Sequence, residues 1–553
     1  MNNAFFYLFM LSVHFGCIFS IRDSYKAAVI EHSPANTGNI HISLATNLRL
    51  YLEYVEQAAY QDVEIIVFPE DGLIGRNVRA SDLPHISTVV PDPKDHISPC
   101  LDRSGSYASF LTELSCASKR HQIYAVVNLV ESVSNNGKYA VYHKTNVVFD
   151  RSGVVISRYR EINTHDEINY VPGPDTIAAF STDFGVTFGI LISYDIIFKT
   201  PALDLLQNEN ITDIVYSSAW VGQLPFYASN SIQHGFSKSS GINLLAAGLN
   251  DPANGNGGSG IYLADGRLLS TYVSGGKTSK LIINNVPKLK LRYDVSNICQ
   301  GSSTFPIQPM NVEIPDIRLF YTLPTDLTNY TVKSLDLKNQ KVFETICTSS
   351  DFCCSFNISV NKYSPIWPNY NYKLVIYDGV SAVSSTKSIG LRNCALVACA
   401  NDSVESCGER NTVPPTGINF LDISILGTFD KNNANYMPIT TTYDLIPSTQ
   451  YAFCQKTKKD EVDIIMYTTQ EHDSLLTFDR KSVVGFVGYC DDNDGYRVWI
   501  DVKDEVILRR NVVFKEECLI KEKLDVCASE EPDKECLETL VMLKKECKSE
   551  VAS

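Results

Sequence analysis

Two patterns of apolar residues alternate along the first half of the chain. In one pattern, apolar residues recur every three or four positions and predict a helix with one buried face. These positions are Leu44, Leu48, Leu52, Val55 and Ala59. In the other pattern, short runs are apolar throughout, which predicts strands of a buried sheet at residues 27–30, 65–68, 125–127, 147–149 and 189–192. The alternation of the two patterns predicts an α/β architecture.

The pattern changes after about residue 300, where the helical period fades. β-rich runs such as residues 372–377 and 482–487 are separated by turns that contain Pro, Asn and Asp. With 553 residues, the chain is too long for one ordinary domain. We therefore expect a first, α/β domain over residues 21–305 and a second, mainly β domain over residues 306–510.

The two ends of the chain differ from these domains. Residues 1–20 carry an uncharged apolar stretch that is too short for a membrane span, which predicts a signal peptide, with a buried N-terminal segment as the alternative. Residues 511–553 are rich in Glu and Lys and contain Cys518, Cys527, Cys536 and Cys547. This segment predicts a small cross-linked helical appendage, with a solvated charged tail as the alternative.

The cysteines and sequons indicate an extracellular protein. Of 16 cysteines, thirteen lie between Cys299 and Cys547, and disulfides are the expected use in a secreted chain. A zinc site is the alternative for the cysteines near residues 353–407, but the chain lacks matching histidine spacing, and we expect no metal and no cofactor. Sequons for N-linked glycosylation begin at Asn210, Asn329, Asn357 and Asn401. We expect a soluble secreted protein without a membrane span or a glycolipid anchor.

The formal net charge of -15 argues against one class of partner. A polyanion is repelled by an acidic protein, and the sequence contains no basic run interleaved with aromatic residues. We expect no nucleic-acid partner, and the sequence does not indicate a protein partner.

Several motifs follow one another in an informative order. An apolar strand runs into a Pro-Glu pair at residues 65–72, IIVFPEDG. Further motifs are VPDPKDHISPC at 90–100, YHKTNVVFDRSGVVISRYR at 142–160, FGVTFGILISYDI at 184–196, and SSAW and GINLLAAGLN before GSGIY at 258–262. In order and spacing the chain resembles the biotinidase and vanin branch of the nitrilase, or carbon-nitrogen hydrolase, superfamily. Members of that branch hydrolyse amides of small vitamins such as biocytin and pantetheine.

The resemblance implies a fold and a covalent mechanism. It implies an α-β-β-α sandwich for the first domain and a vanin-type β-rich second domain. Apart from the resemblance, a secreted chain favours disulfides, and Cys100 and Cys116 are a disulfide candidate within the first domain. In such a mechanism a Cys thiolate attacks the amide carbonyl, a Glu moves protons and a Lys stabilises the oxyanion. Glu70 matches the Glu position, but Glu161 stands at the Lys position and Ser193 stands at the Cys position.

Three compensations are open for the two substituted positions. In the first, Arg160, or Arg158 with a backbone shift, replaces the missing cation. In the second, His165 or His234 activates Ser193. In the third, Glu70 and Glu161 act as paired carboxylates.

We expect a catalytically impaired protein that keeps the amidase scaffold and its pocket for a small amide ligand. One alternative is an active amidohydrolase on linear amides of the pantetheine or biocytin type. Another is a structural or adhesion role for the β-rich domain and the cysteine tail, because an odd number of cysteines follows the signal peptide.

Overall fold

The computed structural model describes most of the chain. The described residues are 23–135, 139–165, 169–293, 316–336, 339–362, 370–383, 387–410, 418–430, 434–449, 451–459, 461–469, 481–490, 497–500 and 505–508. The described residues up to 490 belong to one compact unit, and residues 497–500 and 505–508 belong to a second. In the second unit, β26 (Arg497–Ile500) and β27 (Glu505–Leu508) pair as an antiparallel hairpin. The predicted signal peptide and the cysteine-rich tail at 511–553 lie outside the described residues.

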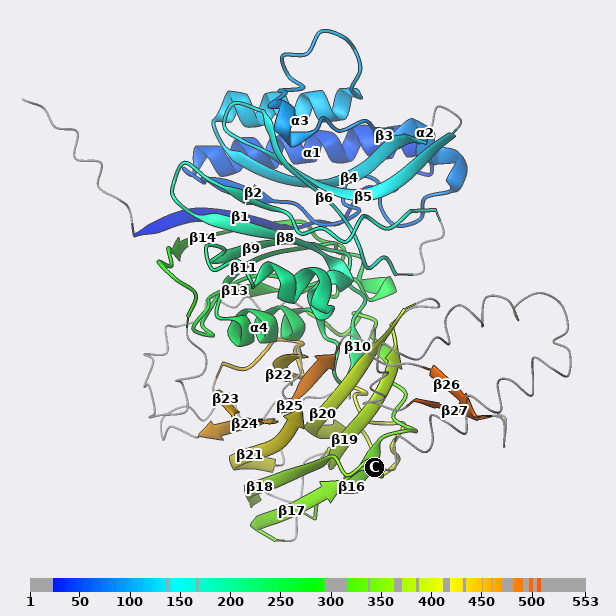
Figure 1. The fold of residues 1–553 in the computed structure, drawn as a ribbon, viewed down its shortest axis with the longest axis vertical. Helices are drawn as coiled ribbons and strands as arrows, with labels where there is room; N and C mark the ends of the chain where they lie inside the picture. The colour runs from blue at the N-terminus through cyan, green and yellow to red at the C-terminus, as the bar shows by residue number, and fades with distance from the viewer. Residues whose placement is uncertain are drawn as a thin grey trace, which may run out of the picture. The chain divides into compact units, whose positions relative to one another are not determined.

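The first half of the chain forms two sheets that pack face to face between helices (Figure 1). The first sheet has the order β14 (Lys280–Pro287), β1 (Ser24–Glu31), β2 (Ile65–Val67), β4 (Tyr124–Asn135), β5 (Tyr139–Phe149) and β6 (Val155–Arg160), with β3 (Ser87–Thr88) beside β4. The second has the order β13 (Leu268–Tyr272), β12 (Ser259–Tyr262), β11 (Asn243–Gly248), β9 (Asp213–Ser218), β8 (Thr187–Ile192) and β7 (Ala179–Ser181). The expected α-β-β-α sandwich is confirmed.

Helices cover both outer surfaces of the sandwich. Helices α1 (Ile40–Tyr60) and α3 (Ser109–His121), with the short α2 (Leu83–Ile86), lie on the first sheet, and α4 (Ser229–Ser240) lies on the second. Among the helices of the described residues, none is long and apolar enough to cross a membrane.

The strands of the sandwich are apolar throughout because both of their faces are buried. On β1, Ala27 and Val29 face the core between the two sheets, whereas Ala28 and Ile30 pack under the helices. Successive side chains of a strand point to opposite faces, so a strand covered on both sides has no polar face. The strands therefore appear in the sequence as runs that are apolar throughout, because the other sheet covers one face and helices cover the other.

Helix α1 contains the predicted apolar positions but turns a slightly different face inward. The Asn39 side chain accepts hydrogen bonds from the first-turn N–H groups and caps the helix. The buried face passes through Tyr51 and Ala58, whereas Leu52 and Ala59 are only partly buried. The Tyr51 ring stacks on Phe68, with ring centroids 4.1 Å apart, on this buried face.

The second domain consists of two five-stranded antiparallel sheets that enclose their own core. One sheet has the order β16 (Thr331–Ser334), β19 (Asn371–Ala382), β20 (Ser388–Cys399), β25 (Lys481–Cys490) and β22 (Ala434–Thr442). The other has the order β17 (Lys341–Cys347), β18 (Cys353–Lys362), β21 (Ile418–Asp430), β24 (Glu461–Thr469) and β23 (Ala452–Thr457). The expected β-rich character is confirmed. A short parallel pair, β10 (Gln223–Leu224) and β15 (Leu323–Pro324), links the two halves of the chain.

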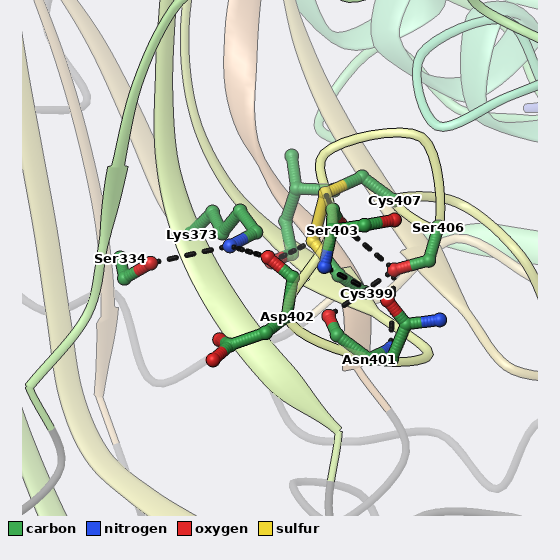
Figure 2. Close-up of a disulfide and its surroundings, with 9 residues drawn as sticks. Ser334, Lys373, Cys399, Asn401, Asp402, Ser403, Ser406 and Cys407 are labelled. Carbon is green, nitrogen blue, oxygen red and sulfur yellow. Dashed lines mark hydrogen bonds between the residues drawn. A yellow bond between two sulfur atoms is a disulfide. The ribbon is translucent and has the colours of Figure 1, made fainter.

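Four disulfides join pairs of described cysteines. In the first domain Cys100 is bonded to Cys116. In the second domain, disulfides include Cys347–Cys353 within the β17–β18 hairpin, Cys354–Cys394 between the two sheets, and Cys399–Cys407 across the turn after β20. The last of these closes the turn that carries the sequon Asn401 (Figure 2). Beside it, the buried Lys373 ammonium donates to the carbonyl of Asp402 at 2.8 Å and to the hydroxyl of Ser334 at 3.1 Å.

Helix α4 packs directly against β22 of the second domain. The Ser231 hydroxyl donates to the carbonyl oxygen of Thr440 at 2.7 Å, and Phe236 shares a core with Met437. At Gly235 the approach is closest, because a Cβ atom built there lies 2.4 Å from the carbonyl oxygen of Pro438. Only glycine permits this separation of the helix and the strand.

We therefore predict that Gly235→Ala lowers the free energy of unfolding by about 1–3 kcal/mol, the usual cost of overpacking. Alanine is the better helix former by about 0.5–1 kcal/mol, so a destabilising sign identifies the contact with Pro438. Urea unfolding measures the change. Gly276→Ala is the matched control, because its added Cβ meets only the Ser274 hydroxyl at 3.9 Å, and equal stability of the two variants contradicts the prediction.

Candidate functional site

Glu70 lies three residues beyond the end of β2, where the ends of strands from both sheets meet. One carboxylate oxygen accepts a hydrogen bond from the backbone N–H of Ala219 at 2.7 Å, just after β9. The Ser217 hydroxyl donates to the carbonyl oxygen of Phe68 at 2.7 Å and ties the same two strand ends together. The Glu70 side chain is 3% exposed, so its charge requires a partner inside the protein.

That partner is Lys144 on β5. Its ammonium lies 2.6 Å from Oε1 of Glu70 and 2.8 Å from Oδ2 of Asp71, and its side chain is 2% exposed. The sequence interpretation missed Lys144. The sequence around it offers little signal beyond its place three residues before the buried run at 147–149.

Glu161 is the neighbour of Lys144 across the sheet. It follows β6 directly, and its backbone N–H donates to the carbonyl oxygen of Lys144 at 2.9 Å. Its side chain is buried. The structure therefore places a lysine on the adjacent strand, beside the position where the resemblance implies one.

The two arginines considered as substitutes are paired with a different carboxylate. Arg160 forms two hydrogen bonds to Glu131, at 2.8 Å and 2.6 Å, and the Arg158 guanidinium lies 3.3 Å from the same carboxylate. Arg158 also donates to the carbonyl oxygen of Val90.

Ser193 opens the turn Ser193–Ile197 that follows β8. It is buried, and its backbone has a φ of +44°. This left-handed conformation costs a non-glycine residue about 1–2 kcal/mol and is kept only where the surroundings enforce it. One such restraint is the Tyr216 hydroxyl, which donates to the carbonyl oxygen of Ser193 at 2.9 Å.

The electrostatic state of Glu70 follows from its neighbours. Burial by itself raises the pKa of this carboxyl, but the Lys144 ammonium, the Arg76 guanidinium and the Ser193 hydroxyl together lower the pKa below its ordinary value. Glu70 is therefore a carboxylate at neutral pH, and it is a weaker base than an ordinary glutamate.

A pocket of about 440 Å³ opens beside Lys144 and Asp71. Its other lining residues are Arg76, Asn77, Val78, His165, Asn169, Tyr170, Asp251, Asn254 and Asn256. The lining is polar and rich in side-chain amides, which offer both donors and acceptors. A ligand with amide or hydroxyl groups matches this chemistry.

The two histidines considered as bases for Ser193 occupy different places. His165 lines the pocket and stacks on Tyr194, with ring centroids 4.6 Å apart, and Tyr194 in turn stacks on Trp220. His234 lies inside α4 with its Nε2 atom 2.9 Å from the carbonyl oxygen of Gly266, and burial lowers its pKa to about 3. A ring in that position is a structural element of the helix packing.

Two family models match the two halves of the chain. The family model described as carbon-nitrogen hydrolase matches residues 26–274, and the model described as Vanin C-terminal domain matches residues 320–482. A model of the retroviral polymerase SH3-like domain also matches residues 466–526. An amidase from Nesterenkonia sp. is a similar solved structure, with a TM-score of 0.37, 18% identity, and coverage of 48% of this chain and 92% of that chain.

Curated relatives match over most of the chain. Vanin-like protein 2 of Drosophila melanogaster is 32% identical over 497 residues, which cover 83% of this chain and 89% of the relative. Pantetheinase of Bos taurus is 29% identical, with coverage of 76% and 83%, and biotinidase of Takifugu rubripes is 27% identical, with coverage of 73% and 84%. With its sandwich, its β-rich second domain and these relatives, the chain belongs to the vanin and biotinidase branch of the carbon-nitrogen hydrolase superfamily.

Proposed function

We propose that this protein is a secreted vanin-type protein that binds a small amide in its pocket and does not hydrolyse it. The observation that carries the proposal is that Ser193 lies beside Glu70, a carboxylate whose pKa is lowered. A serine hydroxyl is a far weaker acid than a thiol, whose ordinary pKa is about 8.5, so its activation needs a strong base. Because Glu70 is a weak base, we expect no turnover of linear amides.

Lys144, in this proposal, supplies the cation that the family carries at the position of Glu161. The two residues are neighbours on adjacent strands, and the Lys144 ammonium is in contact with Glu70. The change at position 161 is then compensated, and the missing thiol alone prevents amide hydrolysis.

The expected ligand class is a linear amide of a small, vitamin-like molecule. Relatives named pantetheinase and biotinidase support this class. The pocket volume of about 440 Å³ lies within the range of small-molecule sites, about 300–1,000 Å³. The amide side chains of Asn77, Asn169 and Asn254 suit the polar groups of such a ligand.

A second candidate function is amide hydrolysis with Ser193 as an unusual nucleophile. The observation in its favour is the enforced left-handed backbone of Ser193 next to Glu70. Strained residues of this kind cluster at active sites.

Ser193→Cys tests both candidates. We predict that wild type and Ser193→Ala show the same background rate on a panel of pantetheine- and biocytin-type amides. Ser193→Cys is expected to exceed both by at least about 100-fold, the usual contribution of one positioned catalytic group. Product formation measured by mass spectrometry reports the rates.

Two results decide against the proposal. Turnover by wild type that Ser193→Ala abolishes establishes the serine amidase instead. If Ser193→Cys shows no turnover, Glu161→Lys is added to it. Activity only in this double variant shows that Lys144 does not replace the family's lysine, and it contradicts the proposed role of Lys144.

The charge of Lys144 also determines stability. We predict that Lys144→Met lowers the free energy of unfolding by about 3 kcal/mol or more near pH 7.5, since two buried carboxylates lose their cation. In wild type the lowered pKa of Glu70 stabilises the fold at neutral pH, and this contribution is lost as the pH falls through the folded-state pKa. In Lys144→Met, burial raises the pKa of Glu70, so the native state takes up a proton and gains stability as the pH falls.

The difference between wild type and Lys144→Met should therefore shrink between about pH 7.5 and pH 4.5, near the ordinary carboxyl pKa of about 4.3. Urea unfolding at several pH values measures it. Lys333→Met is the matched control, because Lys333 forms an ion pair of similar length with Glu344, 2.7 Å, but its side chain is 52% exposed. A pH-independent difference, or equal effects of the two substitutions, contradicts the prediction.

Secretion is part of the proposal and has its own test. Asn210, Asn329, Asn357 and Asn401 are all exposed, and disulfides join eight described cysteines in four pairs. We predict that the chain expressed in animal cells appears in the medium and loses mass when N-linked glycans are removed enzymatically. Deletion of residues 1–20 should retain it in the cell without glycans, and secretion of the deletion variant contradicts the assignment.

A further inference from the structure

Asn163 joins the segment that contains Glu161 to the turn that begins at Ser193. Asn163 lies two residues after Glu161, and both its backbone N–H and its side-chain amide donate to Oδ1 of Asp195, at 2.9 Å and 2.8 Å. The same amide nitrogen lies 2.9 Å from the carbonyl oxygen of Thr200. Asp195 belongs to the turn that Ser193 opens, so Asn163 holds that turn against the segment of Glu161.

Asp195 is enclosed as well as bonded. It is fully buried, and its second oxygen accepts a hydrogen bond from the Tyr159 hydroxyl at 2.7 Å. Burial raises its pKa to about 6, although the hydrogen bonds from Tyr159 and Asn163 oppose that rise. The turn therefore depends on the donors that face Asp195.

A lysine of the second domain reaches Asn163 from the other side. Lys387 directly precedes β20, and its ammonium donates to the side-chain oxygen of Asn163 at 2.6 Å and to the carbonyl oxygen of Ile162 at 3.0 Å. The same ammonium lies 5.6 Å from the centre of the Phe198 ring, just beyond the Ser193 turn. One side chain of the second domain thus contacts both segments.

The charges on either side fix the orientation of the Asn163 amide. Its oxygen faces the Lys387 ammonium, and its nitrogen faces the Asp195 carboxylate. A flipped amide would direct its N–H groups at an ammonium and its oxygen at a carboxylate, and both contacts are repulsive. Lys387 therefore determines which atom Asn163 presents to Asp195.

We infer that Lys387 is a positioning residue through which the second domain holds the Ser193 turn in its left-handed conformation. The contacts run from Lys387 to Asn163, from Asn163 to Asp195, and from Asp195 to the turn that begins at Ser193. This assigns the second domain a part in building the site of the first. The inference concerns geometry and holds whether or not the protein hydrolyses an amide.

The test places a reporter at the turn and removes the lysine. In full-length protein carrying Ser193→Cys, the alkylation rate of the introduced thiol by iodoacetamide is measured from about pH 6 to pH 10, with peptide mass spectrometry to assign the label. Hydrogen exchange of residues 193–198 is measured on the same samples. Lys387→Met is compared with Lys387→Arg, which keeps the cation.

We predict that Lys387→Met speeds hydrogen exchange at 193–198 by at least about tenfold and shifts the pH profile of the thiol, and that Lys387→Arg restores much of both. Lys373→Met is the matched control, because this lysine is buried in the second domain and its hydrogen bonds go to Asp402 and Ser334 (Figure 2). It is expected to lower stability and leave both readouts unchanged.

Two outcomes overturn the inference. One is an unchanged exchange rate and thiol profile in Lys387→Met. The other is an equal change in Lys373→Met, which reports general loosening of the second domain. Amide turnover by wild type refutes the proposed function alone, because neither readout depends on catalysis.

Discussion

The Lys144 side chain is 2% exposed, so its ammonium requires negative charge around it, and in this fold two consecutive residues provide that charge. Neighbouring residues of an extended chain point to opposite sides, so Glu70 and Asp71 would not ordinarily reach one cation. Asp71 has a φ of +58°, and its backbone N–H donates to the side-chain oxygen of Asn128 at 3.2 Å. This turn brings both carboxylates to Lys144, and the resulting ion pairs keep Glu70 a carboxylate and place Lys144 and Asp71 at the wall of the pocket.

The layers of the first domain were predictable from the sequence because buried strands and helices have characteristic local patterns of apolar residues. A run such as 65–68 is apolar throughout, and the Pro-Glu pair after it identifies Glu70 without knowledge of any other strand. Lys144 has no comparable local pattern around it. Its role depends on the register of β5 and β6, in which Thr145 is opposite Arg160, and on the turn at Asp71. Strand register is a property of the assembled sheet, so the sequence alone points to the arginines near residue 161 as the substitute cation.

In the second domain, too, contacts between residues far apart in the sequence cannot be predicted from local patterns. The crowding of cysteines after residue 299 predicted disulfides, but spacing alone does not reveal that Cys354 pairs with Cys394 across two sheets. The contact of Lys387 with Asn163 spans 224 residues and has no local signature. Composition and periodicity predict features of each domain separately. The contacts between the domains depend on the complementarity of the two folded surfaces.

The adjacency of positions 144 and 161 constrains how such a site can change through single substitutions. Starting from a lysine at 161 and ending with one at 144, two orders are available. If the lysine at 161 is replaced first, the intermediate holds buried carboxylates with neither lysine beside them, which is the costly case for a folded protein. If Lys144 is gained first, a lysine faces Glu70 at every step. The effect of a substitution at either position therefore depends on the residue at the other, and their energetic contributions do not add.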